Sequence, residues 1–152
     1  MYDIDLKLGE YCREHQWRYT RYADDLTFSG ELLINELLRF ATKTIEQKQF
    51  KVNKEKTRIA NRNARQEVTG IIVNDYMQVP RETRMSIRQQ IYYIRKFGLD
   101  SHLSHIGETR KNYVRHLLGM ASHALFINPN DKKMKEIVTS LKQLLETSNT
   151  SM

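Results

Sequence analysis

The chain has 152 residues, of which 25 are Lys or Arg and 18 are Asp or Glu, giving a formal net charge of +7. Apolar side chains make up 39% of the sequence, which is enough for a core and excludes a fully disordered chain. The single cysteine, Cys12, excludes an internal disulfide and a zinc site built from several cysteines. No apolar stretch is long enough to span a membrane and the acidic start does not resemble a signal peptide, so we expect a cytoplasmic protein without a membrane partner.

The first part of the chain predicts a hairpin between two helices. Apolar residues at helical spacing predict helices over residues 3–16 and 31–47. Between them, residues 17–22 and 26–29 alternate in the manner of β-strands. The tight turn that joins these strands would consist of Ala23, Asp24 and Asp25.

Residues 50–80 contain weaker β signals. The alternation in residues 50–59 allows a short strand at each end of that segment. The β-branched run 66–74 is bounded by the turn signal Asn74-Asp75, with YMQV beyond it, and predicts a second hairpin. Pro80 ends this part, so we expect an α+β region over residues 1–80.

Residues 81–152 predict a bundle of three helices. Apolar stripes extend over residues 82–97 and 109–126, and Gly98 follows the first stripe as a stop signal. After a break at Pro129, either Asn130 or Asp131 can cap the last helix.

Positive charge is concentrated in residues 81–119, where eight basic and three acidic residues give 8 − 3 = +5. Its arginines recur at near-helical spacing, at Arg81, Arg84, Arg88 and Arg95. Such a stripe can follow a phosphate backbone, although a solvated helix face is the simpler interpretation. His102 and His105, in the same segment, are interpreted as solvated or phosphate-facing side chains.

The adjacent carboxylates Asp24 and Asp25 are the strongest candidates for chemistry. Neighbouring carboxylates repel each other unless they are solvated or neutralised. At a hairpin tip both can reach a hard cation, and Mg²⁺ suits such a site because substrate phosphates complete its coordination. Two such ions about 4 Å apart can activate an attacking hydroxyl and neutralise a leaving pyrophosphate. An ordinary solvated turn is the alternative.

The run YTRYADDLTFS, residues 19–29, resembles the catalytic hairpin of reverse transcriptases, most closely that of the bacterial retron group. Residues 52–57, VNKEKT, resemble the family's next palm motif through Asn53, Lys56 and Thr57, although Gln49 and Phe50 replace its glycine and leucine. Residues 68–74, VTGIIVN, resemble the hairpin that helps to hold the primer strand. The resemblance covers residues 1–80 and implies an incomplete polymerase palm, an antiparallel sheet with helices, followed by a helical thumb over residues 81–152.

The resemblance also implies a role for individual residues. Asp24 would be a direct ligand of the catalytic Mg²⁺ ions, and Asp25 a second, more weakly bound carboxylate. Tyr22 would lie beside the primer terminus and Lys56 near the incoming triphosphate, while Thr69 and Gly70 would shape the primer-holding hairpin. A salt-bridging lysine and a tight turn or bulge at Gly70 are equally good structural interpretations. The thumb contacts to the duplex backbone would be Arg88, Arg95, Lys96, Arg110, Lys111 and Arg115.

The family's third carboxylate comes from an earlier strand that the motifs here do not include. Ile4-Asp5-Leu6 imitates that strand but lies too close to the hairpin, and Asp3 and Asp5 instead match the helix that leads into it. We therefore expect the third carboxylate and the nucleotide-gripping fingers to belong to an upstream half of the enzyme.

The function implied by the resemblance is that of a palm-and-thumb portion of a retron-type RNA-directed DNA polymerase. It would transfer nucleotides from deoxynucleoside triphosphates to a primer hydroxyl on an RNA template, and would be inactive without the upstream half. The implied partners are the RNA template, the RNA/DNA duplex and a cognate noncoding RNA, with a role in defence against phage. The alternative is a non-catalytic module, derived from a reverse transcriptase, that binds RNA or a duplex.

Overall fold

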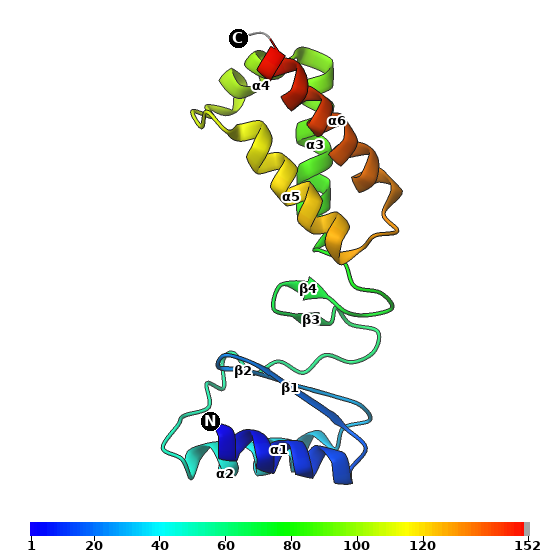
Figure 1. Cartoon of the computed structure of the whole chain (residues 1–152). Coiled ribbons are helices and arrows are strands. Elements are labelled where there is room, and N and C mark those ends of the chain that lie inside the picture. The colour runs from blue at the N-terminus through cyan, green and yellow to red at the C-terminus, as the bar shows by residue number, and fades with distance from the viewer. Residues whose placement is uncertain (151–152) are drawn as a thin grey trace. The chain divides into compact units, whose positions relative to one another are not determined.

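The structure, a computed structural model, describes residues 1–150, with side chains up to Glu146. It divides into two compact units, Met1–Ala60 and the segment that begins at Asn61 (Figure 1). Each unit has its own hydrophobic core. The predicted functional boundary at residue 80 between palm and thumb is a different division and stays a prediction.

The first unit is a two-stranded hairpin packed on two helices. Helix α1 (Tyr2–Glu14) leads into β1 (Arg18–Tyr22), which pairs antiparallel with β2 (Asp25–Ser29) before helix α2 (Ile34–Glu46). Figure 1 shows the hairpin crossing over one side of both helices. The predicted helices and hairpin are confirmed, with ends that differ by up to three residues.

Alternation along the hairpin gives it one apolar and one polar face. Directly paired residues of an antiparallel ladder share a face, so Tyr19 and its partner Phe28 lie on the same side. That side packs on the helices, where the contacting core residues are Ile4, Leu8 and Ala41. The opposite side carries polar residues and the tyrosine of the motif, namely Thr20, Tyr22, Asp25 and Thr27.

Residues 50–59 form a loop, so the short strands that their alternation allowed are wrong. The polar pattern instead builds a local turn around Asn53. Its side-chain oxygen Oδ1 accepts hydrogen bonds from the backbone N–H of Glu55 at 3.0 Å and of Lys56 at 3.4 Å. The Thr57 hydroxyl donates to the Asn53 carbonyl at 3.0 Å. The spacing of Asn53 and Thr57 therefore serves turn formation, since Asn side chains readily replace backbone groups in turns.

The second unit opens with a short hairpin, β3 (Glu67–Val68) and β4 (Ile71–Ile72). The two residues between the strands, Thr69 and Gly70, have φ of 48° and 80°. Positive φ at both central residues is the sign pattern of a type I′ turn, whose twist matches that of paired strands. A second hairpin forms, but its turn lies at Thr69–Gly70, as a turn rather than a bulge, and not at the predicted Asn74–Asp75. Around Asn74–Asp75 an isolated bridge joins Ile72 to Gln78.

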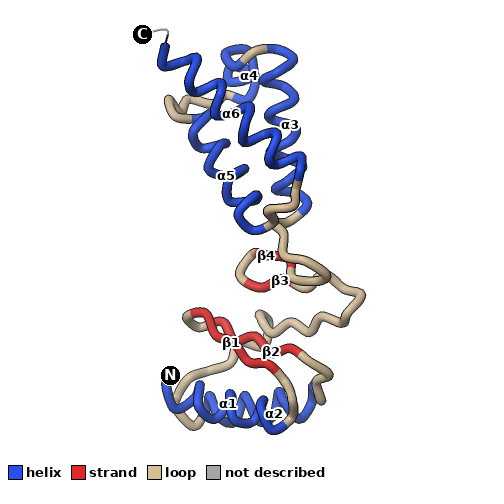
Figure 2. The backbone as a smooth tube through the Cα atoms, turned by 45° about the vertical axis from the view of Figure 1, so that its right-hand side comes forward, coloured by secondary structure: helices blue, strands red, loops and turns tan. Residues whose placement is uncertain are grey.

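Four helices follow: α3 (Arg81–Phe97), α4 (Leu99–Ile106), α5 (Tyr113–Ile127) and α6 (Lys132–Thr150). In Figures 1 and 2, α3, α5 and α6 lie side by side, and the short α4 lies at one end of them. The centre of the bundle is apolar and includes Ile87, Leu117, Met134 and Leu141. The bundle is confirmed, but α4 was not predicted. Among the described residues no helix combines the length and apolarity needed to cross a bilayer.

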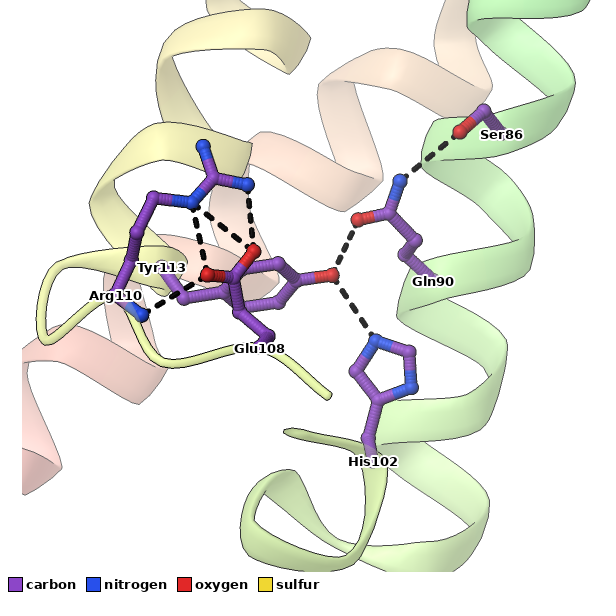
Figure 3. Close-up of polar contacts among 6 residues, drawn as sticks. All are labelled: Ser86, Gln90, His102, Glu108, Arg110 and Tyr113. Atoms are coloured by element: carbon purple, nitrogen blue, oxygen red, sulfur yellow. Dashed lines mark hydrogen bonds and ion pairs between the residues drawn. The ribbon is translucent and has the colours of Figure 1, made fainter. Parts of the chain in front are cut away.

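A chain of hydrogen bonds that runs from the exposed Ser86 to the buried His102 connects α3, α4 and α5 (Figure 3). The Tyr113 hydroxyl donates to Gln90 Oε1, and Gln90 Nε2 donates to the Ser86 hydroxyl at 2.9 Å. Because that single hydroxyl proton is used, His102 Nε2, 3.0 Å from the Tyr113 oxygen, must be the donor. His102 is 3% exposed, so its interpretation as a solvated or phosphate-facing side chain is wrong. Burial lowers the pKa of His102, and the neighbouring His105 adds to this effect.

We predict that the bundle loses stability in mild acid because of His102. Because folding lowers the pKa of His102 below its ordinary value of 6.5, the unfolded chain takes up a proton more readily than the folded chain as the pH falls below that value. The free energy of unfolding therefore decreases in mild acid. Urea unfolding at about pH 7.5 and about pH 5 should show a fall in the free energy of unfolding that is smaller in His102→Gln.

The matched control is His123→Gln, since His123 is an exposed histidine on α5 and takes no part in the contacts of His102. It should keep the pH dependence of the parent chain. An identical pH dependence in parent and His102→Gln would contradict the prediction.

Candidate functional site

The tip of the first hairpin presents the two predicted catalytic carboxylates. Tyr22 pairs with Asp25, so Ala23 and Asp24 are the two turn residues. Ala23 has φ of 53°, whereas Asp24 is not among the residues with positive φ. This is the sign pattern of a type II′ turn, in which the first central residue is usually glycine. An alanine in that conformation is uncommon and is the kind of local strain found at functional sites.

Both carboxylates are open to solvent and available to a ligand. Asp24 and Asp25 are exposed, and neither side chain has a hydrogen bond or ion pair within the described part of the chain. Tyr22, 72% exposed, lies directly opposite Asp25 on the polar face of the hairpin. Two unpaired carboxylates fit Mg²⁺, which is commonly held by one or two carboxylates together with waters and substrate phosphates. No group of three or more His, Cys, Asp or Glu side chains suited to a metal occurs among the described residues.

An ion pair with helix α1 holds the hairpin tip. Arg21 donates to Asp5 in a two-pronged arrangement, from Nε to Oδ1 at 2.7 Å and from Nη2 to Oδ2 at 2.8 Å. The remaining Nη1 of Arg21 donates to the carbonyl of Ala23 at 2.7 Å. The Tyr19 hydroxyl also donates to Asp5, at 2.7 Å. One guanidinium therefore connects the helix to the backbone of the turn that carries Asp24.

These contacts also fix the state of Asp5. Hydrogen bonds from Arg21 and then Tyr19 lower the pKa of the Asp5 carboxyl, so it stays ionised. Burial, together with the hydrogen bond to Asp5, raises the pKa of Tyr19. The Asp5 oxygens are thus occupied within the hairpin anchor, which agrees with the assignment of Asp5 to the leading helix rather than to a metal site. Sequence reasoning missed this anchor, although opposite charges on a helix and the following strand were a possible signal.

The remaining predicted site residues lie on turns. Lys56 is exposed in the Asn53 turn of the first unit and has no ion pair among the described residues. Thr69 and Gly70 form the turn between β3 and β4, in the second unit.

Two of the predicted backbone-binding arginines face helix α6. Arg95 Nη2 donates to the Ser140 hydroxyl at 2.5 Å. Arg88 Nη2 lies 4.0 Å from Asp131 Oδ2, at the start of α6. Lys96 takes a different direction, with its ammonium 5.5 Å from the ring centre of Tyr92 and 5.1 Å from that of Phe97.

The predicted contacts near the start of α5 differ in availability. Arg110 is clamped by Glu108, with Nη2 to Oε2 at 2.6 Å and Nε 3.0 Å from both carboxylate oxygens (Figure 3). The hydrogen bonds from Arg110 lower the pKa of Glu108 to about 2, so this pair stays ionised at neutral pH. Lys111 and Arg115 are exposed and have no ion pair within the described residues. Arg110 is therefore the least available of the predicted backbone contacts.

Basic residues at the start of α6 were missed by sequence reasoning. Lys132 and Lys133 line the same surface depression as Arg84 and Arg88. The segment 120–152 carries four basic and three acidic residues, so its small net charge concealed the local run DKKMK. A shorter counting window would have detected it.

We predict that the anchor limits motion of the hairpin tip. Replacing Arg21 with Gln removes both the ion pair to Asp5 and the bond to the turn carbonyl, so amide hydrogen exchange in residues 18–29 should accelerate. Arg18→Gln is a matched control on the same strand, because Arg18 is exposed and takes no part in the anchor. Equal exchange rates in Arg21→Gln and the parent chain would show that the anchor has no mechanical role.

Comparison with known proteins places these features in a family context. No family profile matches the chain. It is 35% identical over 106 residues to the retron Mx65 reverse transcriptase of Myxococcus xanthus, a match that covers 68% of this chain and 25% of the relative. It is 32% identical over 111 residues to the retron Mx162 reverse transcriptase of the same organism, covering 61% and 23% respectively.

A third relative, the retron Ec86 reverse transcriptase of Escherichia coli, is 28% identical over 106 residues, covering 68% of this chain and 33% of the relative. The matched part thus spans about a quarter to a third of the length of these relatives. The resemblance inferred from the motifs is confirmed, and nothing in the matches favours a non-catalytic module.

Proposed function

Because the chain is related to the retron reverse transcriptases, we propose that it forms the catalytic-hairpin and thumb portion of an RNA-directed DNA polymerase. The observation that carries this proposal is the pair of exposed, unpartnered carboxylates, Asp24 and Asp25, on an anchored hairpin tip. In this proposal residues 1–80 belong to the palm and residues 81–152 to the thumb. The third carboxylate and the fingers come from an upstream half.

Asp24 and Asp25 would hold Mg²⁺ at the hairpin tip. The metal, when bound, supplies charge neutralisation for the leaving pyrophosphate and lowers the proton affinity of the primer hydroxyl. The chain's own contribution is positional. Arg21 fixes the turn backbone. The pairing of Tyr22 with Asp25 puts both residues on one face of the hairpin, where the tyrosine would support the primer terminus.

Other residues would bind the substrates rather than the metal. The free ammonium of Lys56 would face the triphosphate and can supply a proton to the leaving pyrophosphate. The tight Thr69–Gly70 turn would support the primer strand. Among the basic thumb residues, Lys111 and Arg115 are open for backbone contacts, which set affinity and salt dependence rather than sequence preference.

The partners in this proposal are an RNA template, the growing RNA/DNA duplex and a cognate noncoding RNA. The reaction would be attack of a primer 3′-hydroxyl on a deoxynucleoside triphosphate in the cytoplasm. Defence against phage is the biological role that we propose for the complete system.

We predict that the purified 152-residue chain alone does not extend a primer in the presence of Mg²⁺ and deoxynucleotides. Two carboxylates without fingers leave the nucleotide unoriented, and orientation supplies much of the rate of such reactions. Mixing or fusing the chain with an upstream half that supplies the missing carboxylate should restore synthesis on an RNA template. Robust extension by the chain alone would overturn the prediction of inactivity.

We predict that Asp24→Ala abolishes synthesis in the restored enzyme. Loss of groups that merely support a metal ligand costs about 10–100-fold, so loss of a ligand should cost at least about 100-fold. Asp75→Ala, which removes an exposed carboxylate in another loop, is the matched control and should retain activity. Retained synthesis in Asp24→Ala would remove the metal-ligand assignment.

A further inference from the structure

A basic cavity lies between helix α3 and the segment that joins α5 to α6. Its volume is about 560 Å³, and its lining includes Arg84 and Arg88 from α3 and Lys132 and Lys133 from the start of α6. These two pairs are distant in the sequence, so the fold brings them together. The only acidic residue in the lining is Asp131.

The two arginines are held in place but poorly compensated. Both are half-buried, and the Nε atom of each is shielded from solvent and has no hydrogen-bond partner among the residues that the structure describes. The Arg84 side chain has no ion pair or hydrogen bond within the described residues. A partly buried guanidinium without an acceptor is unfavourable, and an incoming anion would supply the missing acceptors.

Asp131 neutralises little of this charge. Its Oδ1 accepts the backbone N–H of Met134 at 3.1 Å and so caps α6, while its Oδ2 remains 4.0 Å from Arg88. The positive end of the α6 dipole lies beside the two lysines and adds to the potential. Four basic side chains and one acidic side chain leave an excess of 4 − 1 = +3 around the cavity.

We propose that this cavity binds one phosphate group of a nucleic acid strand. Arginine matches the oxygens of a phosphate through its planar fork, and the concave shape admits a phosphate with its neighbouring sugar. The identity of the strand rests on the proposed function, whereas the affinity for phosphate rests on the cavity itself. The site adds Lys132 and Lys133 to the backbone contacts expected from the sequence, and joins them to Arg84 and Arg88 of the arginine stripe.

The test is binding of the full chain to a fluorescent RNA–DNA hybrid, measured by anisotropy between about 50 and 200 mM KCl. Arg84→Lys keeps the charge but removes the planar fork, so affinity should fall several-fold. Arg84→Gln should also reduce the slope of log affinity against log salt by about one. The matched control Arg62→Lys, at an exposed position of the same unit outside the cavity, should bind like the parent chain.

A variant that is expected to gain affinity controls for loss of binding through misfolding. Asp131→Asn keeps a side-chain oxygen that can cap α6 but removes the negative charge from the cavity, so the hybrid should bind more tightly. A misfolded variant would not bind more tightly in this way. Equal affinity of Arg84→Lys and the parent chain, or no gain in Asp131→Asn, would overturn the proposed site.

The outcome separates this proposal from the proposed function. If the parent chain binds the hybrid but the cavity variants behave like it, only the cavity assignment fails. If the cavity variants change binding as expected while the restored enzyme does not polymerise, the cavity stands and the proposed function fails. Absence of any binding by the parent chain overturns the cavity site and the thumb contacts together.

Discussion

The contact between Arg21 and Asp5 determines how the candidate active site is built. A two-stranded hairpin is marginally stable by itself and gains its position from what it packs against. The apolar face of the hairpin rests on α1 and α2, but this contact is non-directional and leaves the tip free to slide. The two-pronged bond from Arg21 to Asp5, with its third branch to the Ala23 carbonyl, is directional and defines the orientation of the turn. Within the part of the chain that the structure describes, Asp24 and Asp25 have no hydrogen bond or ion pair, so their charge is available to a cation.

The sequence predicted those elements whose own residues carry the signal. Alternation in residues 17–22 and 26–29 predicted the hairpin, because one face carries Tyr19, Leu26 and Phe28 and the other is mostly polar. Helix α4 was missed because eight residues are too few for a clear helical period. His102 was misassigned for a related reason, since its burial depends on Tyr113, which lies on another helix. The polar alternation of residues 50–59 suggested strands but reflects a turn organised by Asn53.

Counting charged residues along the sequence located the basic part of the chain, but it did not show which basic side chains are free to contact a phosphate. Arg110 contributes to the positive excess of residues 81–119, yet its guanidinium donates three hydrogen bonds to the Glu108 carboxylate and its backbone N–H donates a fourth. Conversely, Lys132 and Lys133 lie in a segment with almost no net charge and still converge with Arg84 and Arg88. The net charge of a segment counts residues that are adjacent in sequence, whereas the electrostatic potential at a bound phosphate depends on the charges that lie near it in the folded protein. Only the packing of α3 against the start of α6 brings these four basic residues together.

The positive φ of Ala23 has a consequence for the entropy of the hairpin tip. A glycine at this position would adopt the same conformation without strain, but it would also sample many others. The alanine methyl group narrows the choice of backbone states, at the cost of local strain that the Arg21 bond to its carbonyl helps to offset. The turn is therefore ordered before any ligand arrives. Little backbone entropy then remains to be lost when the carboxylates bind a cation. The affinity of the tip for the cation is therefore set mainly by the contacts between the carboxylate oxygens and the cation.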